Sequence, residues 1–216
     1  MSENKITEVV FILDKSGSMN GLESDTAGGF NSVIEEQKKK EGKVYVSAVL
    51  FNSESEVLYD RVDIENIRPM KAEDFITYGT TALIDAMGDA IHHIGNIHKY
   101  ARKEDVPENT IFVIMTDGME NSSHRYSSEK VKKMVERQKS EYGWEFLFLG
   151  ANIDAVETAK SYGIAEDRSV TFCSDSVGHA LNYKAVSSFI GRKRRNSEEP
   201  IDASWADEIR ERKIKK

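Results

Sequence analysis

The amino-acid sequence predicts an α/β fold: a doubly wound, Rossmann-like, mostly parallel central sheet flanked by helices, with one antiparallel edge strand. The 216 residues fit one domain of ordinary size better than two. Strand-like apolar runs alternate with segments of helical spacing, and this alternation implies crossover connections within a parallel sheet. One close pair of strand-like runs, separated by a turn around Ser53 and Glu54, fits the antiparallel edge.

Six segments have the composition of strands. Residues 9–13 and 110–115 are continuous, β-branched apolar runs, which are typical of strands buried on both faces of a parallel sheet. Residues 44–51 alternate between two faces, and a shorter strand-like run follows at residues 57–62. The last two strands are predicted at residues 146–149 and 169–172.

Helices are predicted in the gaps between the strands. Apolar residues recur at helical spacing over residues 30–37, before three lysines that complement the helix dipole. A longer helical pattern covers residues 83–100, and Ser127 has the side chain of an N-cap for a third helix. Two further helices are predicted at residues 155–162 and 178–190.

The pattern is lost near the C-terminus. The sequence predicts a domain over residues 1–190 and a charged C-terminal tail over residues 191–216. Three apolar residues leave room for a short helix in this tail: Trp205, Ile209 and Ile214. The basic run Arg192–Arg195 could contact nucleic acid or an acidic partner, but a solvated tail explains it more simply. On this interpretation, truncation after Gly191 leaves folding unchanged.

Composition and charge exclude several classes of protein. The net charge of −7 disfavours broad nucleic-acid binding, because phosphate attraction needs surplus Lys and Arg. Cys173 is the single cysteine, so no intramolecular disulfide can form. The polar N-terminus has no signal peptide, and no apolar run has the length that spans a bilayer. We therefore expect a cytoplasmic protein in a reducing environment, with no membrane partner.

A short motif directly follows the first predicted strand. Asp14, Ser16 and Ser18 alternate there, and Gly17 allows the backbone to curl so that all three side chains can face one point. In open α/β sheets, ligands bind beyond the carboxyl ends of the strands, where the strand order reverses. One carboxylate and two hydroxyls suit a hard divalent cation rather than zinc. Taken alone, these residues are equally ordinary in a plain turn.

Two further segments strengthen the metal-site interpretation. Asp117 ends the strand 110–115 in the same way, so Asp14 and Asp117 would converge if these strands were neighbours. Two such carboxylates would repel each other unless a cation lay between them or one took up a proton. A glycine-led loop delivers Thr80 and Thr81 ahead of a helix, where N-capping is the simpler explanation for either threonine alone.

Together, the segments Asp14–Met19, Gly79–Leu83 and Thr116–Gly118 resemble the metal-ion-dependent adhesion site (MIDAS) of von Willebrand factor type A domains. The resemblance covers roughly residues 5–190, and all three pieces occur in the family's order. It implies five metal ligands: Asp14, Ser16, Ser18, Thr81 and Asp117. By this resemblance, Ser16 and Ser18 would bind the ion directly, Thr81 directly or through water, and the two aspartates mostly through water. Thr81 matches the family's threonine better than Thr80.

The resemblance also implies a function. The metal would be Mg²⁺, with Mn²⁺ or Ca²⁺ as alternatives. It would leave one coordination position for a Glu or Asp carboxylate of another protein. The chain would then be a protein-interaction module within an intracellular multi-protein assembly, of undetermined oligomeric state. Coupling of the site to movement of the last helices is a further hypothesis.

The rival interpretation is a metal-dependent hydrolase or phosphoryl-transfer enzyme that uses the same site. It needs a nearby base or nucleophile, and the sequence offers poor candidates. His92 and His93 lie within a predicted helix, and His124 follows the Asp117 loop as a candidate for the binding rim. There is no Gly-x-Ser-x-Gly elbow, and Asp14 lacks a second aspartate two residues on. A structural scaffold with a vestigial site is a third possibility, which five intact ligand positions disfavour.

Overall fold

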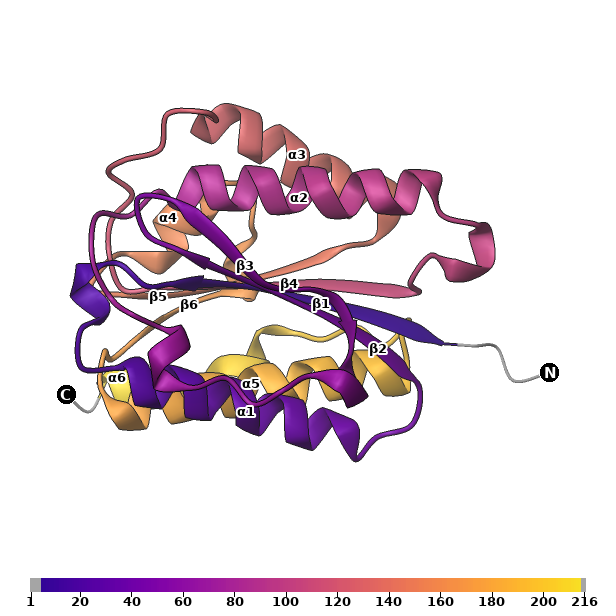
Figure 1. The fold of residues 1–216 in the computed structure, drawn as a ribbon, viewed down its shortest axis with the longest axis horizontal. Coiled ribbons are helices and arrows are strands. Elements are labelled where there is room, and N and C mark those ends of the chain that lie inside the picture. Colours follow the sequence, from indigo (N-terminus) through magenta and orange to yellow (C-terminus); the bar gives the residue numbers. More distant parts are fainter. Residues whose placement is uncertain (1–4, 215–216) are drawn as a thin grey trace.

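A six-stranded sheet runs through the middle of the protein, between two layers of helices (Figure 1). The computed structural model describes residues 5–214, so the first four residues of the polar N-terminus lie outside the described part. The strands are β1 (Ile6–Asp14), β2 (Lys43–Phe51), β3 (Ser55–Asp63), β4 (Asn109–Thr116), β5 (Glu145–Ala151) and β6 (Ser169–Phe172). All six strands that the sequence predicts are therefore present.

The order of the strands is β3-β2-β1-β4-β5-β6, and β3 alone is antiparallel to its neighbour. The predicted fold class is confirmed, including the antiparallel edge. The chain builds one half of the sheet outward from β1 and then returns to add β4 on the other side of β1. The order of the sheet thus reverses between β1 and β4, where Leu13 pairs with Met115. The residues after these two strands therefore emerge side by side.

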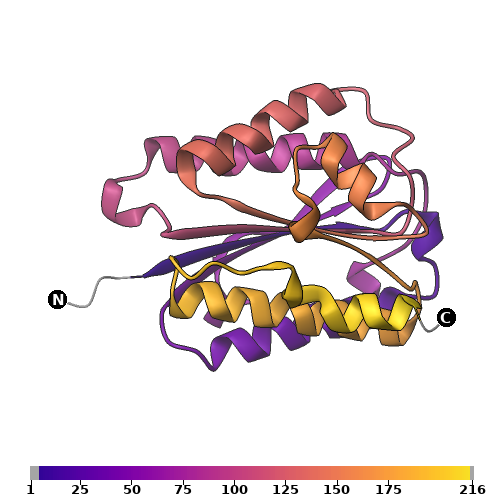
Figure 2. The same cartoon turned by 180° about the vertical axis from the view of Figure 1, so that it is seen from behind.

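Helices cover both faces of the sheet (Figures 1 and 2). On one face lie α1 (Glu23–Lys38), α5 (Ser176–Arg195) and α6 (Asp207–Ile214). On the other lie α2 (Leu83–Tyr100), α3 (Ser128–Tyr142) and α4 (Ala155–Ser161). Short 3₁₀ turns occur in the connections: Gly17–Met19, Ile64–Asn66, Ala72–Asp74, Lys103–Asp105, Glu166–Arg168 and Ala203–Ala206.

The central strands are buried on both faces, as their continuous apolar runs predict. In β1, Val9 and Phe11 belong to the core beneath α1 and α5, whereas Val10 and Ile12 belong to the core beneath α2 and α3. Successive side chains of a strand point to opposite faces, so one apolar run supplies both cores. This double burial holds the ends of β1 and β4 in place.

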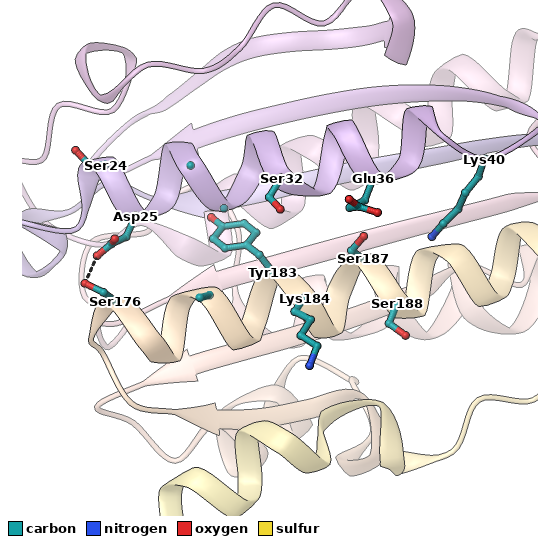
Figure 3. Close-up of a pocket in the computed structure, with 13 residues that line it drawn as sticks. Ser24, Asp25, Ser32, Glu36, Lys40, Ser176, Tyr183, Lys184, Ser187 and Ser188 are labelled. Carbon is teal, nitrogen blue, oxygen red and sulfur yellow. Dashed lines mark hydrogen bonds between the residues drawn. The ribbon is translucent and has the colours of Figure 1, made fainter.

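Helices α1 and α5 pack side by side, and Figure 3 looks into the groove between them. A Cβ atom at Gly29 would collide with the ring of Tyr183, so this close approach requires glycine. At one end of the groove, the Ser176 hydroxyl donates a hydrogen bond of 2.7 Å to Asp25 (Figure 3). The contact ties the start of α5 to the start of α1.

The structure differs from the predicted tail after residue 190. Helix α5 continues to Arg195, and the Arg194 guanidinium is buried against the end of α1. It donates hydrogen bonds to the carbonyl oxygens of four residues, at 2.6 to 3.0 Å: Gln37, Lys40, Glu41 and Gly42. Gln37 lies in the last turn of α1, where carbonyls lack partners within the helix, and the other three acceptors lie in the loop after α1.

The remaining basic residues of this run also have partners within the domain. Arg192 and Arg195 pair with Glu199, and Lys193 pairs with Glu145 at 3.0 Å. Beyond them, three apolar side chains are buried in the core beneath α1 and α5: Ile201, Trp205 and Ile209. The short terminal helix is present as α6, but the segment before it packs against the domain instead of extending into solvent.

The account of Arg194 gives a first prediction. Arg194→Met removes the donor to the buried Gln37 carbonyl and to three carbonyls of the loop after α1, so it lowers the free energy of unfolding by about 3 kcal/mol. Arg195→Met, which removes an exposed ion pair next to it, changes that free energy by less than about 0.5 kcal/mol. Urea unfolding measures both.

Truncation after Gly191 removes Arg194 and the buried Trp205 together, so we expect it to prevent stable folding. Equal stability of the truncated and full-length chains would show that residues 192–216 are the solvated tail that their composition suggests.

Candidate metal site

Side chains from the ends of β1 and β4 meet at the point where the strand order reverses. The hydroxyl oxygens of Ser16 and Ser18 lie 3.1 Å apart. The Ser18 hydroxyl donates a hydrogen bond of 2.5 Å to Oδ1 of Asp117, across 99 residues of sequence. The parallel pairing of β1 with β4 thus brings Ser18 and Asp117 together, a proximity for which the sequence gives only an indication.

Asp14, the last residue of β1, adjoins this cluster and is almost completely buried. Its Oδ1 accepts a hydrogen bond of 2.7 Å from the backbone N–H of Ser16, and its Oδ2 accepts one of 2.6 Å from the Thr116 hydroxyl. Both carboxylate oxygens are therefore fixed by the loop and by the neighbouring strand. The first of these bonds shapes the turn that carries Ser16 and Ser18.

Three hydroxyl groups gather around Gly118. A Cβ atom placed on Gly118 would lie 3.2 Å from Oγ1 of Thr81, 3.3 Å from Oγ of Ser18 and 4.0 Å from Oγ of Ser16. Thr80 is directed elsewhere, because its hydroxyl lies 2.9 Å from Oγ of Ser53. Of the two threonines, Thr81 is the one that faces the serines and Asp117.

The loop that carries Thr81 is fastened to the β1 loop by its backbone. The N–H of Gly17 donates to the carbonyl of Gly79 at 3.2 Å, and the N–H of Tyr78 donates to the carbonyl of Lys15 at 3.1 Å. Gly79 has a φ of +76°, a left-handed conformation that favours glycine. A Cβ there would also lie 2.7 Å from Oγ of Ser53. The glycine therefore serves the turn that presents Thr81.

A carboxylate holds the loop after Asp117 to the start of α2. Glu120 accepts hydrogen bonds from the backbone N–H groups of Ile84 (2.9 Å), Ser122 (2.9 Å) and Ser123 (2.7 Å). The Ile84 bond satisfies one of the free N–H groups at the beginning of the helix.

Asp85 holds the next part of the same loop. It accepts from the N–H groups of His124, Arg125 and Tyr126, at 2.9 to 3.0 Å. Burial alone would raise the pKa of Asp85, but these backbone donors outweigh it and hold the pKa below its usual value. The negative charge of Asp85 is therefore stable in the folded protein, and the loop around it is firmly ordered.

The pKa values of both aspartates of the cluster are raised. Burial raises the pKa of Asp14, and the charge of Asp117 adds to the effect. Burial also raises the pKa of Asp117, although the hydrogen bond from Ser18 opposes the rise. Within residues 5–214, neither carboxylate has an ion pair with Lys or Arg, and nearby Lys15 is paired with Glu56 at 2.5 Å. The cluster therefore carries negative charge that the protein does not neutralise.

The donor set fits a hard divalent cation. It consists of two carboxylates and three hydroxyls, all oxygen ligands of the kind that Mg²⁺, Mn²⁺ and Ca²⁺ prefer. In the part of the chain that the structure describes, no group of three or more His, Cys, Asp or Glu side chains could hold a metal ion. Any ion at this edge would therefore depend on the hydroxyls of Ser16, Ser18 and Thr81.

Sequence reasoning missed several residues around the cluster. Thr116 fixes Asp14, and Asn121 accepts a 2.9 Å hydrogen bond from the N–H of Thr81. Asn152, in a left-handed conformation after β5, donates to the carbonyl of Asp117 at 3.5 Å. Nothing in the sequence signals these roles, because each depends on which strand or loop lies beside it.

The histidines of the rival enzyme interpretation lie outside the cluster. His92 and His93 are exposed on α2, and His93 pairs with Asp60 at 2.8 Å. The side chain of His124 is exposed, with Nδ1 3.3 Å from the carbonyl of Ser122. Buried His179 lies nearer, and burial lowers its pKa. Among the described residues, no histidine donates to or accepts from the five predicted ligands.

In residues 5–214, no helix is both long enough and apolar enough to cross a membrane.

Comparisons with known proteins agree with the fold. The sequence profile of the von Willebrand factor type A domain matches residues 8–184. A comparison with curated proteins found no match.

Three solved structures illustrate the likeness. Proximal thread matrix protein 1 from the mussel byssus is 14% identical, with a TM-score of 0.58 over 86% of this chain and 46% of its own. A von Willebrand factor type A protein from Catenulispora acidiphila is 13% identical, with a TM-score of 0.56 over 86% of this chain and 42% of its own. The vWF domain of the type V pili tip protein Mfa5 from Porphyromonas gingivalis is 12% identical, with a TM-score of 0.68 over 91% and 99%.

This chain spans less than half the length of the first two proteins and nearly all of the Mfa5 domain. At these identities the likeness concerns the fold alone. The family profile covers most of the chain, however, and the strand order and motifs lie where the profile matches. The chain therefore belongs to the von Willebrand factor type A domain family.

Proposed function

We propose that this domain is a metal-dependent protein-interaction module, which binds Mg²⁺ through Asp14, Ser16, Ser18, Thr81 and Asp117 and thereby captures an acidic side chain of a partner. The observation that carries the proposal is the convergence of three hydroxyls around Gly118, next to the two aspartates. These oxygens come from three distant segments, and a plain turn would not require them to meet.

The hydroxyl groups and the aspartates would have different roles in binding the cation. The hydroxyls of Ser16, Ser18 and Thr81 face one point and would bind the cation there. Each oxygen of the Asp14 carboxylate already accepts one hydrogen bond, so Asp14 would orient the serine loop and contribute negative charge to the site. The cation, once bound, supplies positive charge at a position that the protein's ligands leave open.

The exposure of the cluster supports access by a partner. Asp14, Ser16, Thr81 and Asp117 are buried, whereas Gly17 and Ser18 are exposed. The open position would therefore face solvent beside Ser18. Without a cation, the unneutralised aspartates repel an incoming carboxylate, and with a cation they no longer do. Binding of an acidic side chain should consequently require the metal.

We favour binding over catalysis because the cluster lacks an accessible general base. Metal-dependent hydrolysis or phosphoryl transfer at this edge would need one within hydrogen-bond reach of the reacting atoms. His124 is directed toward Ser122, and His179 is buried. We place the module, by analogy with stand-alone members of its family, in an intracellular multi-protein assembly.

One prediction concerns charge. In chelator, Asp117→Asn raises the melting temperature by a few degrees, because it removes one of two buried like charges while its amide oxygen still accepts from Ser18. With millimolar Mg²⁺, wild type gains stability and Asp117→Asn gains much less. Differential scanning calorimetry measures both effects.

Asp85→Asn is the matched control for this experiment. It alters a buried carboxylate that backbone donors already satisfy, so it lowers stability equally with and without Mg²⁺. An equal Mg²⁺-dependent gain in Asp117→Asn and in wild type would contradict the assignment of Asp117.

A second prediction separates the two threonines. Thr81→Val keeps the size of the side chain and removes a hydroxyl of the cluster, so we expect Mg²⁺ affinity to fall roughly tenfold or more. Thr80→Val removes the neighbouring hydroxyl, which bonds Ser53, and should leave Mg²⁺ affinity unchanged. Isothermal titration calorimetry with MgCl₂ measures both variants. The assignment of Thr81 is wrong if both variants bind Mg²⁺ like wild type.

The proposed function itself is tested by capture of partners from source-cell lysate. Wild type with Mg²⁺, wild type with chelator, and Asp14→Ala with Mg²⁺ are compared, and bound proteins are identified by mass spectrometry. We expect at least one partner that only metal-loaded wild type retains. If the same partners bind in all three conditions, a metal bridge is not the mechanism.

A further inference from the structure

Large apolar side chains are exposed on both sides of the candidate metal site. Tyr78 is 58% exposed and Met119 is 74% exposed, and Ile76, two residues before Tyr78, is 65% exposed. We call Tyr78 and Met119 the apolar rim. Single exposed apolar side chains are ordinary, but these two each adjoin a residue that contacts the cluster, and aromatic residues and Met are enriched at binding surfaces.

The two rim residues lie on opposite sides of the end of β1. Tyr78 precedes Gly79 in the loop that is bonded to Lys15 and Gly17, and Thr80 of the same loop contacts Ser53 beyond β2. Met119 instead follows Gly118, at the end of β4. The residue after Tyr78 and the one before Met119 both contact the cluster: the Gly79 carbonyl accepts from the N–H of Gly17, and Gly118 lies beside the hydroxyls of Ser18 and Thr81.

The backbone on each side of the rim is firmly held. The N–H of Tyr78 donates to the carbonyl of Lys15, and the next residue accepts from Gly17. On either side of Met119, Gly118 approaches the cluster and Glu120 accepts from three backbone N–H groups. Neither side chain therefore belongs to a loosely tethered loop, so binding would have to order the side chains but not the backbone that carries them.

The polar surroundings of Tyr78 do not neutralise an acidic partner. The Lys15 ammonium lies 6.0 Å from the centre of the Tyr78 ring but is already paired with Glu56. Among the residues that the structure describes here, Lys15 is already paired, so the proposed cation would attract the carboxylate and the rim would add apolar contacts. A ligand that uses both the central cation and the apolar side chains beside it must therefore carry a carboxylate and apolar groups together.

From this arrangement we infer that the partner segment carries a Glu or Asp flanked on both sides by large apolar residues, which pack on Tyr78 and Met119 while the carboxylate binds the metal. The inference rests on the proposed function, since it assigns the specificity of the same site. The metal would bind the Glu or Asp of the partner, and the apolar rim would favour partners in which apolar residues flank that Glu or Asp.

The test uses two synthetic peptides that differ only beside a central Glu: one has Leu on both sides and the other has Ser. Binding to the full-length protein is followed by fluorescence anisotropy, with Mg²⁺ and with chelator. We expect the Leu-flanked peptide to bind roughly tenfold more tightly than the Ser-flanked one, and neither to bind in chelator.

The double variant Tyr78→Ser, Met119→Ser should bind both peptides with the same affinity while its Mg²⁺ affinity stays that of wild type. Tyr142→Ser is the matched control, because Tyr142 is 57% exposed at the end of α3, just before β5 begins. It therefore lies at the opposite end of the strands from the cluster. This control should keep the preference for Leu.

The outcomes separate the two proposals. Equal, Mg²⁺-dependent binding of both peptides to wild type would overturn the rim and leave the proposed function intact. Binding of the Leu-flanked peptide that persists in chelator would overturn the inference that rim and metal act on one ligand. Absence of any Mg²⁺-dependent peptide binding would overturn both. If sedimentation showed Mg²⁺-dependent self-association that the double variant abolishes, a second copy would cover the rim and the inference would be wrong.

Discussion

Two buried carboxylates at the ends of adjacent parallel strands impose the main constraint on this structure. Asp14 and Asp117 are brought together because β1 and β4 pair in register through Leu13 and Met115. Burial raises the pKa of both carboxyl groups, and the charge of Asp117 raises the pKa of Asp14 further. The sheet is buried on both faces, so the strands cannot separate to relieve the repulsion. The two carboxylates therefore need hydrogen-bond donors or a cation from the loops that follow these strands.

The surrounding loops partly meet this need through hydrogen bonds. Ser16 and Thr116 donate to Asp14, and Ser18 donates to Asp117. Each donor is a neutral group, so the bonds orient the carboxylates without cancelling their charge. A divalent cation would cancel it, which is why the same geometry that costs folding free energy supports the proposed metal site. The stability of the domain and its binding of a partner would thus depend on one cluster.

The parts of the fold that follow from local pattern were predictable from the sequence. The continuous apolar run of β1 implies burial on both faces, and Ser127 accepts from the N–H of Lys130 as an N-cap should. The positions of Asp14 and Asp117 followed from the same runs, because each aspartate ends one. Their roles as metal ligands, and those of the three hydroxyls, stay predictions.

Other features depend on contacts between distant segments and have no local signal. Arg194 belongs to a run of four basic residues that resembles a solvated tail, yet it binds carbonyls at the end of α1 and in the loop after it, about 150 residues earlier. Asn152 and Asn121 likewise act through loops that only the strand order brings near. Helical spacing also failed at the end of α5, because the buried residue there, Arg194, is charged and does not fit the apolar pattern that the prediction uses.

The central claim is that the cluster at the ends of β1 and β4 holds a divalent cation. Crystals grown with Mn²⁺, which takes the same oxygen ligands as Mg²⁺ and scatters anomalously, test it most directly. The account predicts one anomalous peak within bonding distance of the Ser16 and Ser18 hydroxyls, close to Thr81 and Asp117. A fully ordered loop over residues 14–18 with no peak beside it, or a peak at another place on the protein alone, would contradict the claim.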